Sequence, residues 1–412
     1  MNPRPRTSST RRRIHGWAVA RLSAIALLSV AIVAAASANP VASRSADSRV
    51  VSNSVERWGS LADIPGVTFQ KLLSPTPARL PGQVAQVATS NSTYYALLTN
   101  GRVYAFGMGN KGQLGNGRTR NSANTPVRVR FPAGVKIAYL PTNVMPYDTG
   151  LAVDTTGHAW GWGVNAGGEL CLGNRRRQLV PVKLPFTHVT ALAGAFQHAV
   201  YEAAGQVWAC GRGRLGELGD GKFHKSFVPV KVRGLGPSAH VVTLVAAFGN
   251  AGALLANGRY LNWGTNGLGQ LGINSPAKRK AVPVAVPLPA GVTQVAQGGS
   301  APGNGQTLVK LKNGAFYGWG ADFQGQLGDG TRTPKFSPVK FSPPSGVTYE
   351  LLASNGSTSY GVTPAGDVYA WGAGQKGQIG NGTKRGSLTP VKVASHAIGI
   401  SGTAYNVLNN IG

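Results

Sequence analysis

Acidic residues, histidines and cysteines are scarce in this chain of 412 residues, and each scarcity argues against a class of chemistry. The sequence contains 13 Asp and Glu, 7 His and 2 Cys, against 41 Lys and Arg. The histidines are scattered singly, without the spacing of a metal site, and neither H-E-x-x-H nor G-x-S-x-G occurs. We therefore expect no metal, no cofactor and no catalytic residue. One alternative stays open, an enzyme whose site is assembled from several repeats at a channel mouth.

Long apolar runs are also missing, apart from one near the N-terminus. Residues 1–38 have the features of a signal peptide: the basic run Arg11–Arg13, an apolar stretch from about Leu22 to Ala36, and small residues before Ala38. We expect cleavage after Ala38 following export by the Sec or the twin-arginine route; the alternative is an uncleaved anchor. Residues 39–49 are rich in Ser and Ala and predict a flexible linker. The mature chain is then secreted, extracellular or in the cell envelope, with no membrane span.

Glycine and proline are abundant instead, and they follow a repeat. The 58 Gly and 26 Pro disfavour long helices and favour short strands joined by turns. An aromatic-Gly pair recurs about every 52 residues, which is in the range of propeller blades. A Pro follows each of these glycines at a nearly constant spacing. The glycines are Gly59, Gly107, Gly163, Gly211, Gly264, Gly320 and Gly372; the prolines are Pro77, Pro126, Pro181, Pro229, Pro283, Pro338 and Pro390.

The two ends of the chain supply complementary parts of one repeat. The first unit, from Val50, lacks the half-repeat that precedes every later aromatic-Gly pair, and the segment from Ile398 to Gly412 has the form of that missing half. Pairing the two segments closes a ring and removes the open sheet edge. The sequence thus predicts that residues 50–412 form one all-β domain, a seven-bladed β-propeller closed by its N- and C-terminal segments in one blade.

A second motif follows six of the seven pairs and carries a resemblance to a known family. The pattern Gly-x-x-x-x-Gly-Gln-Leu-Gly after an aromatic-Gly strand resembles the regulator of chromosome condensation repeat, which forms seven-bladed propellers. WD-type and kelch patterns fit less well. Within the motif the sixth residue after the first glycine is Gln or Glu: Gln113, Glu169, Glu217, Gln270, Gln326 and Gln378.

The resemblance implies binding rather than catalysis. Nuclear members of the family are guanine-nucleotide exchange factors for the small GTPase Ran and touch chromatin, and an exported bacterial relative inhibits β-lactamase with loops of one face. We therefore expect a monomeric, non-catalytic scaffold that binds a protein through loops on one propeller face. Guanine-nucleotide exchange is an alternative that rests on the family resemblance alone.

The two cysteines occupy repeat positions that no other unit gives to Cys. Cys171 replaces the last Gly of the Gly-Gln-Leu-Gly motif, and Cys210 replaces the aromatic residue of the next aromatic-Gly pair. These positions fall in consecutive blades and are expected to lie near one another. In an exported protein the arrangement favours a disulfide; the alternative is two separately buried thiols.

Basic residues gather between the Gly-Gln-Leu-Gly motif and the Pro of each repeat. Equivalent loops leave a propeller at equivalent places, so these residues are expected to form a basic loop ring that attracts polyanions or acidic proteins. An anionic cell-envelope polymer is the alternative partner, and plain solubility is the alternative role. The ring consists of Arg118, Arg120, Arg175, Arg176, Arg177, Lys222, Lys225, Lys278, Arg279, Lys280, Arg332, Lys335, Lys384 and Arg385.

Two further expectations concern the surface of this ring. These loops appear in the sequence without acids, which strengthens their attraction for polyanions, but also without interleaved aromatic residues for base stacking, which together with export argues against specific nucleic-acid recognition. The first loop lacks the Gly-Gln-Leu-Gly motif and contains Ile64, Val67 and Phe69. If exposed, these three form an apolar notch that marks a partner site; the alternative is that they pack inward and seal the closing blade.

Overall fold

A computed structural model describes residues 52–59, 72–91, 93–141, 145–299, 304–402 and 406–411. The predicted signal peptide, the predicted linker and the apolar notch of Ile64, Val67 and Phe69 lie outside the described residues, and those predictions stand as they were made.

The described chain forms seven antiparallel sheets of four strands each, and one short 3₁₀ helix at Pro237–Ala239. Blade 1 consists of β27 (Ala397–Gly402), β28 (Asn406–Ile411), β1 (Ser54–Gly59) and β2 (Leu72–Arg79); blade 2 of β3 (Val84–Ser90), β4 (Thr93–Leu98), β5 (Val103–Gly107) and β6 (Ser122–Arg128); blade 3 of β7 (Ile137–Tyr139), β8 (Thr149–Asp154), β9 (Ala159–Gly163) and β10 (Gln178–Lys183); blade 4 of β11 (Val189–Ala195), β12 (His198–Ala203), β13 (Gln206–Gly211) and β14 (Ser226–Lys231). Blade 5 consists of β15 (Val241–Ala247), β16 (Asn250–Leu255), β17 (Tyr260–Thr265) and β18 (Arg279–Ala285); blade 6 of β19 (Val292–Gly298), β20 (Gln306–Leu311), β21 (Phe316–Gly320) and β22 (Lys335–Phe341); blade 7 of β23 (Leu351–Ser354), β24 (Thr358–Val362), β25 (Val368–Gly372) and β26 (Ser387–Ala394).

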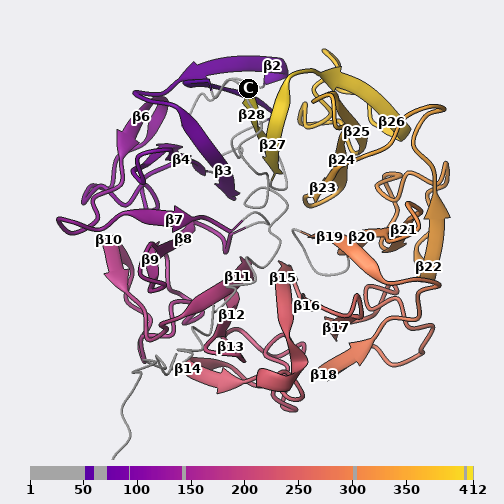
Figure 1. Cartoon of the computed structure of the whole chain (residues 1–412), viewed down its shortest axis with the longest axis horizontal. Coiled ribbons are helices and arrows are strands. Elements are labelled where there is room, and N and C mark those ends of the chain that lie inside the picture. Colours follow the sequence, from indigo (N-terminus) through magenta and orange to yellow (C-terminus); the bar gives the residue numbers. More distant parts are fainter. Residues whose placement is uncertain are drawn as a thin grey trace, which may run out of the picture. The chain divides into compact units, whose positions relative to one another are not determined.

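The blades are arranged around a central axis as a β-propeller, which confirms the predicted fold. Figure 1 shows the first strand of each blade nearest the axis and the fourth strand on the rim. Each blade continues in sequence order from its inner to its outer strand, apart from blade 1.

Blade 1 is built from both ends of the described chain, as the incomplete first repeat predicts. The strand β1 pairs antiparallel with β28, with Val55 opposite Asn410 and Trp58 opposite Val407. The strand β2 completes this sheet on the outside, and β27 completes it on the inside. The pairing leaves neither β1 nor β28 as an open edge.

Tryptophans of the aromatic-Gly pairs join neighbouring blades through a buried hydrogen bond. Each indole Nε1 donates to the backbone oxygen of the Gln or Glu in the preceding blade's Gly-Gln-Leu-Gly motif, over 2.8–3.1 Å. Indole rings give large buried area, and the N–H group is satisfied at the same time. The five donors are Trp58, Trp162, Trp263, Trp319 and Trp371.

The last glycine of each motif makes room for that tryptophan. A Cβ atom added to Gly272 or Gly328 would lie 2.7 Å from the indole of the next blade, and both residues have positive φ angles, of 69° and 75°. A side chain here would collide with the ring and would strain the backbone. The glycine pattern of the sequence therefore records close contacts between blades.

Apolar side chains of adjacent blades form the cores. One cluster, for example, joins Val200 and Leu218 of blade 4 to Leu244 and Trp263 of blade 5. No helix in the described part of the chain is long and apolar enough to cross a membrane.

Candidate binding face

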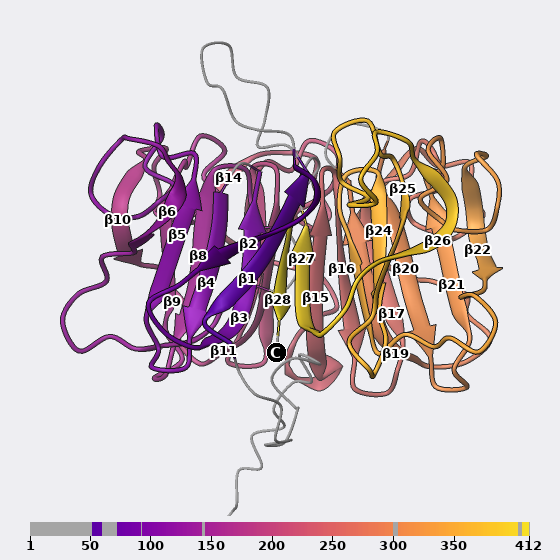
Figure 2. The same cartoon turned by 90° about the horizontal axis from the view of Figure 1, so that it is seen from above.

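One face of the propeller carries the basic loops. In every four-stranded antiparallel blade, the turn between the first and second strands and the loop between the third and fourth strands leave at the same end. We call the latter loops the c–d loops. The strand β28 ends toward the lower edge of Figure 2, so the c–d loops lie along the upper edge.

The structure places all members of the predicted basic loop ring on this face. Arg279 and Lys280 belong to the beginning of β18 and Lys335 to the beginning of β22, whereas the other eleven lie in c–d loops. All are exposed except Lys280 and Lys335, which are partly buried. The ring is therefore an accessible set of cations on one side of the molecule.

Side-chain hydrogen bonds hold the c–d loops in defined conformations. The carboxamide oxygens of Asn116, Asn174 and Asn381 each accept the backbone N–H of the residue two positions later. Asp220 and Asp329 do the same with a carboxylate oxygen. These turns place ring residues at the tips of ordered loops.

A second contact stabilises the base of five of the described loops, two residues after the glycine of the aromatic-Gly pair. In blades 3 and 5, Asn165 and Asn266 donate from Nδ2 to two loop carbonyls each, over 2.9–3.4 Å. In blades 2, 4 and 7 the position is Gly109, Gly213 or Gly374. A Cβ atom there would collide with a carbonyl of the loop itself. Either way the loop packs against its own base, so the cations above it are preorganised.

Two corrections to the expected ring follow from the structure. The loops do contain acids. Asp329 forms an ion pair with Lys335 at 3.1 Å, and Asp220 pairs with His224 at 2.6 Å. Both aspartates directly follow the last Gly of the Gly-Gln-Leu-Gly motif, and their carboxylates reach basic side chains of the loop.

The second correction concerns aromatic residues, which do interleave with the cations. The guanidinium of Arg279 lies 4.1 Å from the ring centroid of Phe223, and that of Arg175 lies 6.0 Å from Phe227. Both pairs cross a blade boundary. The partners of each pair are far apart in the sequence, so the sequence pattern alone does not reveal the contact.

A further aromatic cluster lies at the inner part of the same face, where no site was predicted. Phe196 and Phe248, in or beside the turns after β11 and β15, are stacked with centroids 4.3 Å apart, and Tyr147 packs edge-on against Phe196 at 5.3 Å. The guanidinium of Arg212 lies about equally far from Phe196 and Phe248, at 5.1 and 5.0 Å. Phe196 has a φ of 47°, a left-handed conformation uncommon for a bulky residue. The residues come from three blades, so only the fold brings them together.

Buried carboxylates support the loops of blades 3 and 4. Glu169 and Glu217 stand where four other blades have Gln, and each accepts the backbone N–H two residues earlier, as Gln113 does. Burial raises the pKa of the Glu169 carboxyl to about 7, against the opposing effect of backbone N–H groups. Burial likewise raises the pKa of Glu217, and Arg212, 3.6 Å away, partly offsets this.

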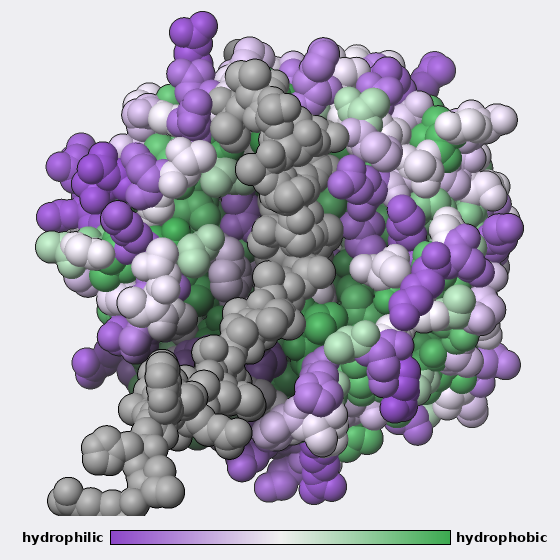
Figure 3. Space-filling view, viewed as in Figure 1, coloured by the Kyte–Doolittle hydropathy of each residue, from purple (hydrophilic) through white to green (hydrophobic). Residues whose placement is uncertain are grey.

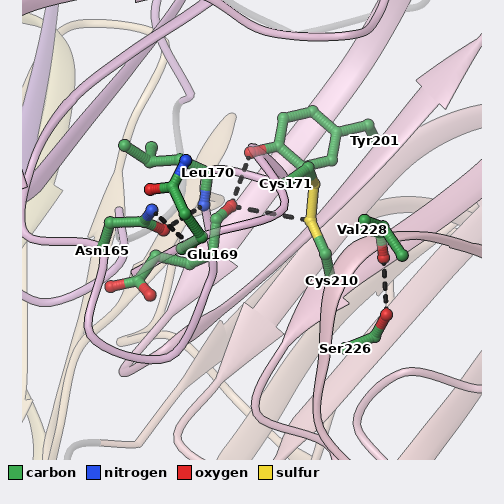
Figure 4. Close-up of a disulfide and its surroundings, with 9 residues drawn as sticks. Asn165, Glu169, Leu170, Cys171, Tyr201, Cys210, Ser226 and Val228 are labelled. Atoms are coloured by element: carbon green, nitrogen blue, oxygen red, sulfur yellow. Dashed lines mark hydrogen bonds between the residues drawn. A yellow bond between two sulfur atoms is a disulfide. The ribbon is translucent and has the colours of Figure 1, made fainter. Parts of the chain in front are cut away.

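The structure joins Cys171 and Cys210 in a disulfide across the boundary between blades 3 and 4 (Figure 4). Their Cα atoms are 5.6 Å apart, a usual separation for a disulfide. Figure 4 also shows the Cys210 sulfur and the Tyr201 hydroxyl directed at the backbone oxygen of Glu169. That oxygen is the counterpart of the one that accepts the tryptophan N–H at other boundaries.

The disulfide thus occupies the place of the Gly–Trp contact. Cys210 stands where five of the other six blades have Trp, so the space above residue 171 is free of an indole and can hold a side chain. Cys171 keeps the left-handed backbone of the glycine that it replaces, with φ of 59°. The replacement of Gly by Cys171 and the replacement of Trp by Cys210 therefore belong to a single change in how blades 3 and 4 pack.

Residues that suggested chemistry are structural or unclustered. In the described part of the chain, no group of three or more His, Cys, Asp or Glu side chains is arranged to hold a metal ion. His198 is fully buried, its Nε2 is 3.2 Å from the Asn250 oxygen, and burial lowers the pKa of its imidazole to about 4. It therefore stays neutral near pH 7.

The opposite face has a different character. Figure 3 shows it with hydrophilic side chains along the rim and apolar surface between them. Two grooves lie there between blades, one of about 450 Å³ beside Phe186 and Trp208 and one of about 310 Å³ beside Tyr260 and Val286. Basic residues of the predicted ring do not line either groove.

Comparisons with known proteins agree with this architecture. Two models of the Regulator of chromosome condensation (RCC1) repeat match residues 100–140, 204–249, 257–301 and 365–402, and residues 84–113. The human E3 ubiquitin-protein ligase HERC2 is 27% identical over 354 residues, which are 84% of this chain and 7% of that protein. The ultraviolet-B receptor UVR8 of Arabidopsis thaliana is 27% identical over 288 residues, 68% of this chain and 63% of the receptor. The chain therefore matches a small part of HERC2 and just under two thirds of UVR8.

Solved structures give the same fold at lower identity. Prp20p of Saccharomyces cerevisiae superimposes with a TM-score of 0.74 at 19% identity, covering 87% of this chain and 91% of Prp20p. Human WBSCR16 gives 0.73 at 18% identity, covering 87% of this chain and 98% of that one. The seven blades, the inter-blade tryptophans, the Gly-Gln-Leu-Gly motifs and these matches show that the chain contains regulator of chromosome condensation repeats and has the propeller fold of proteins built from them.

Proposed function

We propose that this protein is a non-catalytic binding scaffold that holds another protein against the face formed by the c–d loops. The observation that carries the proposal is the set of ordered loops on one face, held by their own side-chain hydrogen bonds and tipped with exposed cations. Such a surface loses little conformational entropy on binding.

Relatives with this fold support a binding role. The yeast structure is described together with the binding of Prp20p to Gsp1p and histones, and a second structure shows Kap60 bound to Prp20. Those partners belong to those proteins. The ligase activity named for HERC2 is not transferred, because this chain matches 7% of its length. Guanine-nucleotide exchange remains a family-level alternative, which release of labelled nucleotide from Ran would test directly.

We also propose that the protein acts outside the cytoplasm, in the envelope or the medium. Residues 1–38 support this through their basic, apolar and small-residue regions. N-terminal sequencing of the protein recovered from culture medium tests it. A first residue of Asn39 supports export with cleavage, and an intact Met1 in the cytoplasmic fraction contradicts it.

A pull-down from the producing cell's envelope and medium, at low and at high salt, tests the scaffold. We expect a discrete protein band that survives high salt, because apolar and hydrogen-bonded contacts are screened less than charge. Substitution of Phe69 or Ile64 then tests whether the apolar notch takes part. Turnover of a substrate by the purified protein would contradict the proposal.

An anionic envelope polymer is the second candidate, and the excess of exposed cations in the ring favours it. Polymer binding depends on released counterions, so it falls steeply as salt rises. Retention of wall polymer only at low salt, and its loss when Arg175–Arg177 and Lys278–Lys280 are reversed in charge, would make the ring a polymer site.

A further inference from the structure

Two arginine–phenylalanine pairs flank blade 4 on the c–d face, one on each side. Arg175 reaches from blade 3 to Phe227 of β14, and Arg279 reaches from blade 5 to Phe223 in the blade 4 loop. A guanidinium over an aromatic ring is attracted by the ring's negative face, and both groups keep their shape when the pair forms. Blade 4 thus has, at each of its two boundaries, an Arg–Phe pair that a binding partner could contact.

Hydrogen bonds fix both arginines in place. Arg175 donates from Nε to the Ala166 oxygen at 2.7 Å, and Arg279 donates from Nη1 to the Arg214 oxygen at 2.9 Å. Each guanidinium has further N–H groups, arranged in the planar fork that matches a carboxylate. An incoming carboxylate therefore meets donors whose side chains are already ordered.

The acids near these pairs do not cancel their charge. Among the described residues in the c–d loops of blades 3 to 5, the carboxylates are Glu169, Glu217 and Asp220. The two glutamates are buried, and Asp220 has a side chain 10% exposed and is 2.6 Å from His224. Arg176, Arg177 and Lys278 are exposed beside them. The sector attracts acidic groups from solution.

An apolar contact point lies among these cations. Phe223 remains 45% exposed although Arg279 covers one side of its ring. The inner aromatic rings of Tyr147, Phe196 and Phe248 pack against one another, and Phe248 is buried, so they form no open stack for successive nucleic-acid bases. Fixed arginines around a single exposed aromatic ring are instead the composition of a protein hot spot.

We propose that the Arg–Phe surface of blade 4, defined as Arg175, Phe223, Phe227 and Arg279, binds an acidic protein segment that carries an apolar side chain. The segment's carboxylates pair with the arginines, and its apolar side chain covers Phe223. This inference rests on the proposed scaffold function and locates its binding site.

A labelled synthetic peptide tests the surface in the full-length protein. The probe is a short glutamate-rich peptide with one central leucine, followed by fluorescence anisotropy; a matched peptide has serine in place of leucine. We expect Arg279→Ala and Phe223→Ala each to weaken binding about tenfold, as hot-spot truncations do. Arg332→Ala removes one equal charge from an exposed position of blade 6, and we expect a change below about twofold. Thermal melting checks that each variant is folded.

Each other outcome overturns the inference. Equal losses from Arg332→Ala and Arg279→Ala would mean diffuse attraction to charge, and equal binding of the serine peptide would remove the apolar contact. Tighter binding of a single-stranded DNA of matched length, sensitive to Phe223→Ala, would make this a nucleic-acid surface. If the pull-down yields a protein partner that Arg279→Ala and Phe223→Ala both still bind, the scaffold stands and this location is wrong.

Discussion

Exchanging the two cysteines for the pair found at other blade boundaries tests whether they form one packing unit. The variants are Cys171→Gly, Cys210→Trp and the double substitution. At five other boundaries, a Cβ atom on the glycine would lie within 2.7–2.9 Å of the partner indole. An indole at position 210 would therefore collide with the Cys171 side chain, and only the double variant restores the contact used elsewhere.

The effects of the two single substitutions on the free energy of unfolding should not add up to the effect of the double substitution. The disulfide closes a separation of 39 residues, which the chain-entropy description values at about 4 kcal/mol. Cys210→Trp loses this and adds about 1–3 kcal/mol of overpacking. The double variant loses the disulfide but regains about 3–5 kcal/mol from burying an indole, and it gives the left-handed position back to glycine.

Urea denaturation under non-reducing conditions measures these differences. We expect Cys210→Trp to be the least stable of the three, and the double variant to lie within about 2 kcal/mol of the parent protein because gains and losses of similar size offset. The matched single variant Cys171→Gly shows the loss of the disulfide without overpacking. If adding Cys171→Gly to Cys210→Trp restores no stability, the two positions do not share one space and the reasoning is refuted.

Three further predictions follow from the described contacts. Burial raises the pKa of Glu169 from 4.5 to about 7, so between these pH values the native state keeps a proton that the unfolded state releases. The free energy of unfolding should therefore fall by up to about 3 kcal/mol from pH 4.5 to 7. Glu169→Gln should remove this part of the fall, as measured by thermal melts across the range. An unchanged pH slope would mean that Glu169 is ionised in the native protein. Gly328→Ala should lower the free energy of unfolding by about 3 kcal/mol or more, because its Cβ atom would lie 2.7 Å from Trp371. Gly330→Ala has a similar φ but open space around it, and should lower the free energy of unfolding by only about 1 kcal/mol. Equal losses in urea denaturation would show that the contact with Trp371 does not limit the residue at position 328. Charge reversal of Arg175–Arg177 should reduce the salt dependence of polyanion binding measured by titration, as fewer counterions are released; an unchanged slope would exclude these three residues from the contact.

The fold was predictable because the residues that define its repeat occupy positions where few other residue types fit. Gly272 and Gly328 lie under indole rings with positive φ, so any other residue would strain or displace the neighbour. Their spacing reveals the number of blades, and the incomplete first repeat reveals how the ring closes. The nearness of Cys171 and Cys210 followed from the same positions, although the reason that both changed together needed the Gly–Trp contact.

The candidate site was only partly predictable. The repeat register showed that the cations share one face, since loops at equal positions leave equal ends of the blades. It did not show the Arg279–Phe223 pair, because the partners belong to different blades and meet only through the inter-blade packing. The cluster of Phe196, Phe248 and Arg212 was missed for the same reason.

The departures from the repeat concentrate at the boundary of blades 3 and 4, which also supports the Arg–Phe surface. The loop that contains Cys171 also carries Arg175. Between these two residues, the backbone N–H of Gly173 donates a hydrogen bond to the Phe227 oxygen at 2.8 Å. At five other boundaries an indole packs between the blades through non-covalent contacts. A covalent bond fixes the base of this loop to blade 4 itself, which carries Phe223 and Phe227. The substitution of a disulfide for an indole thus adds a covalent link at one of the two boundaries that border the Arg–Phe surface, where a rigid loop lowers the entropic cost of holding a partner.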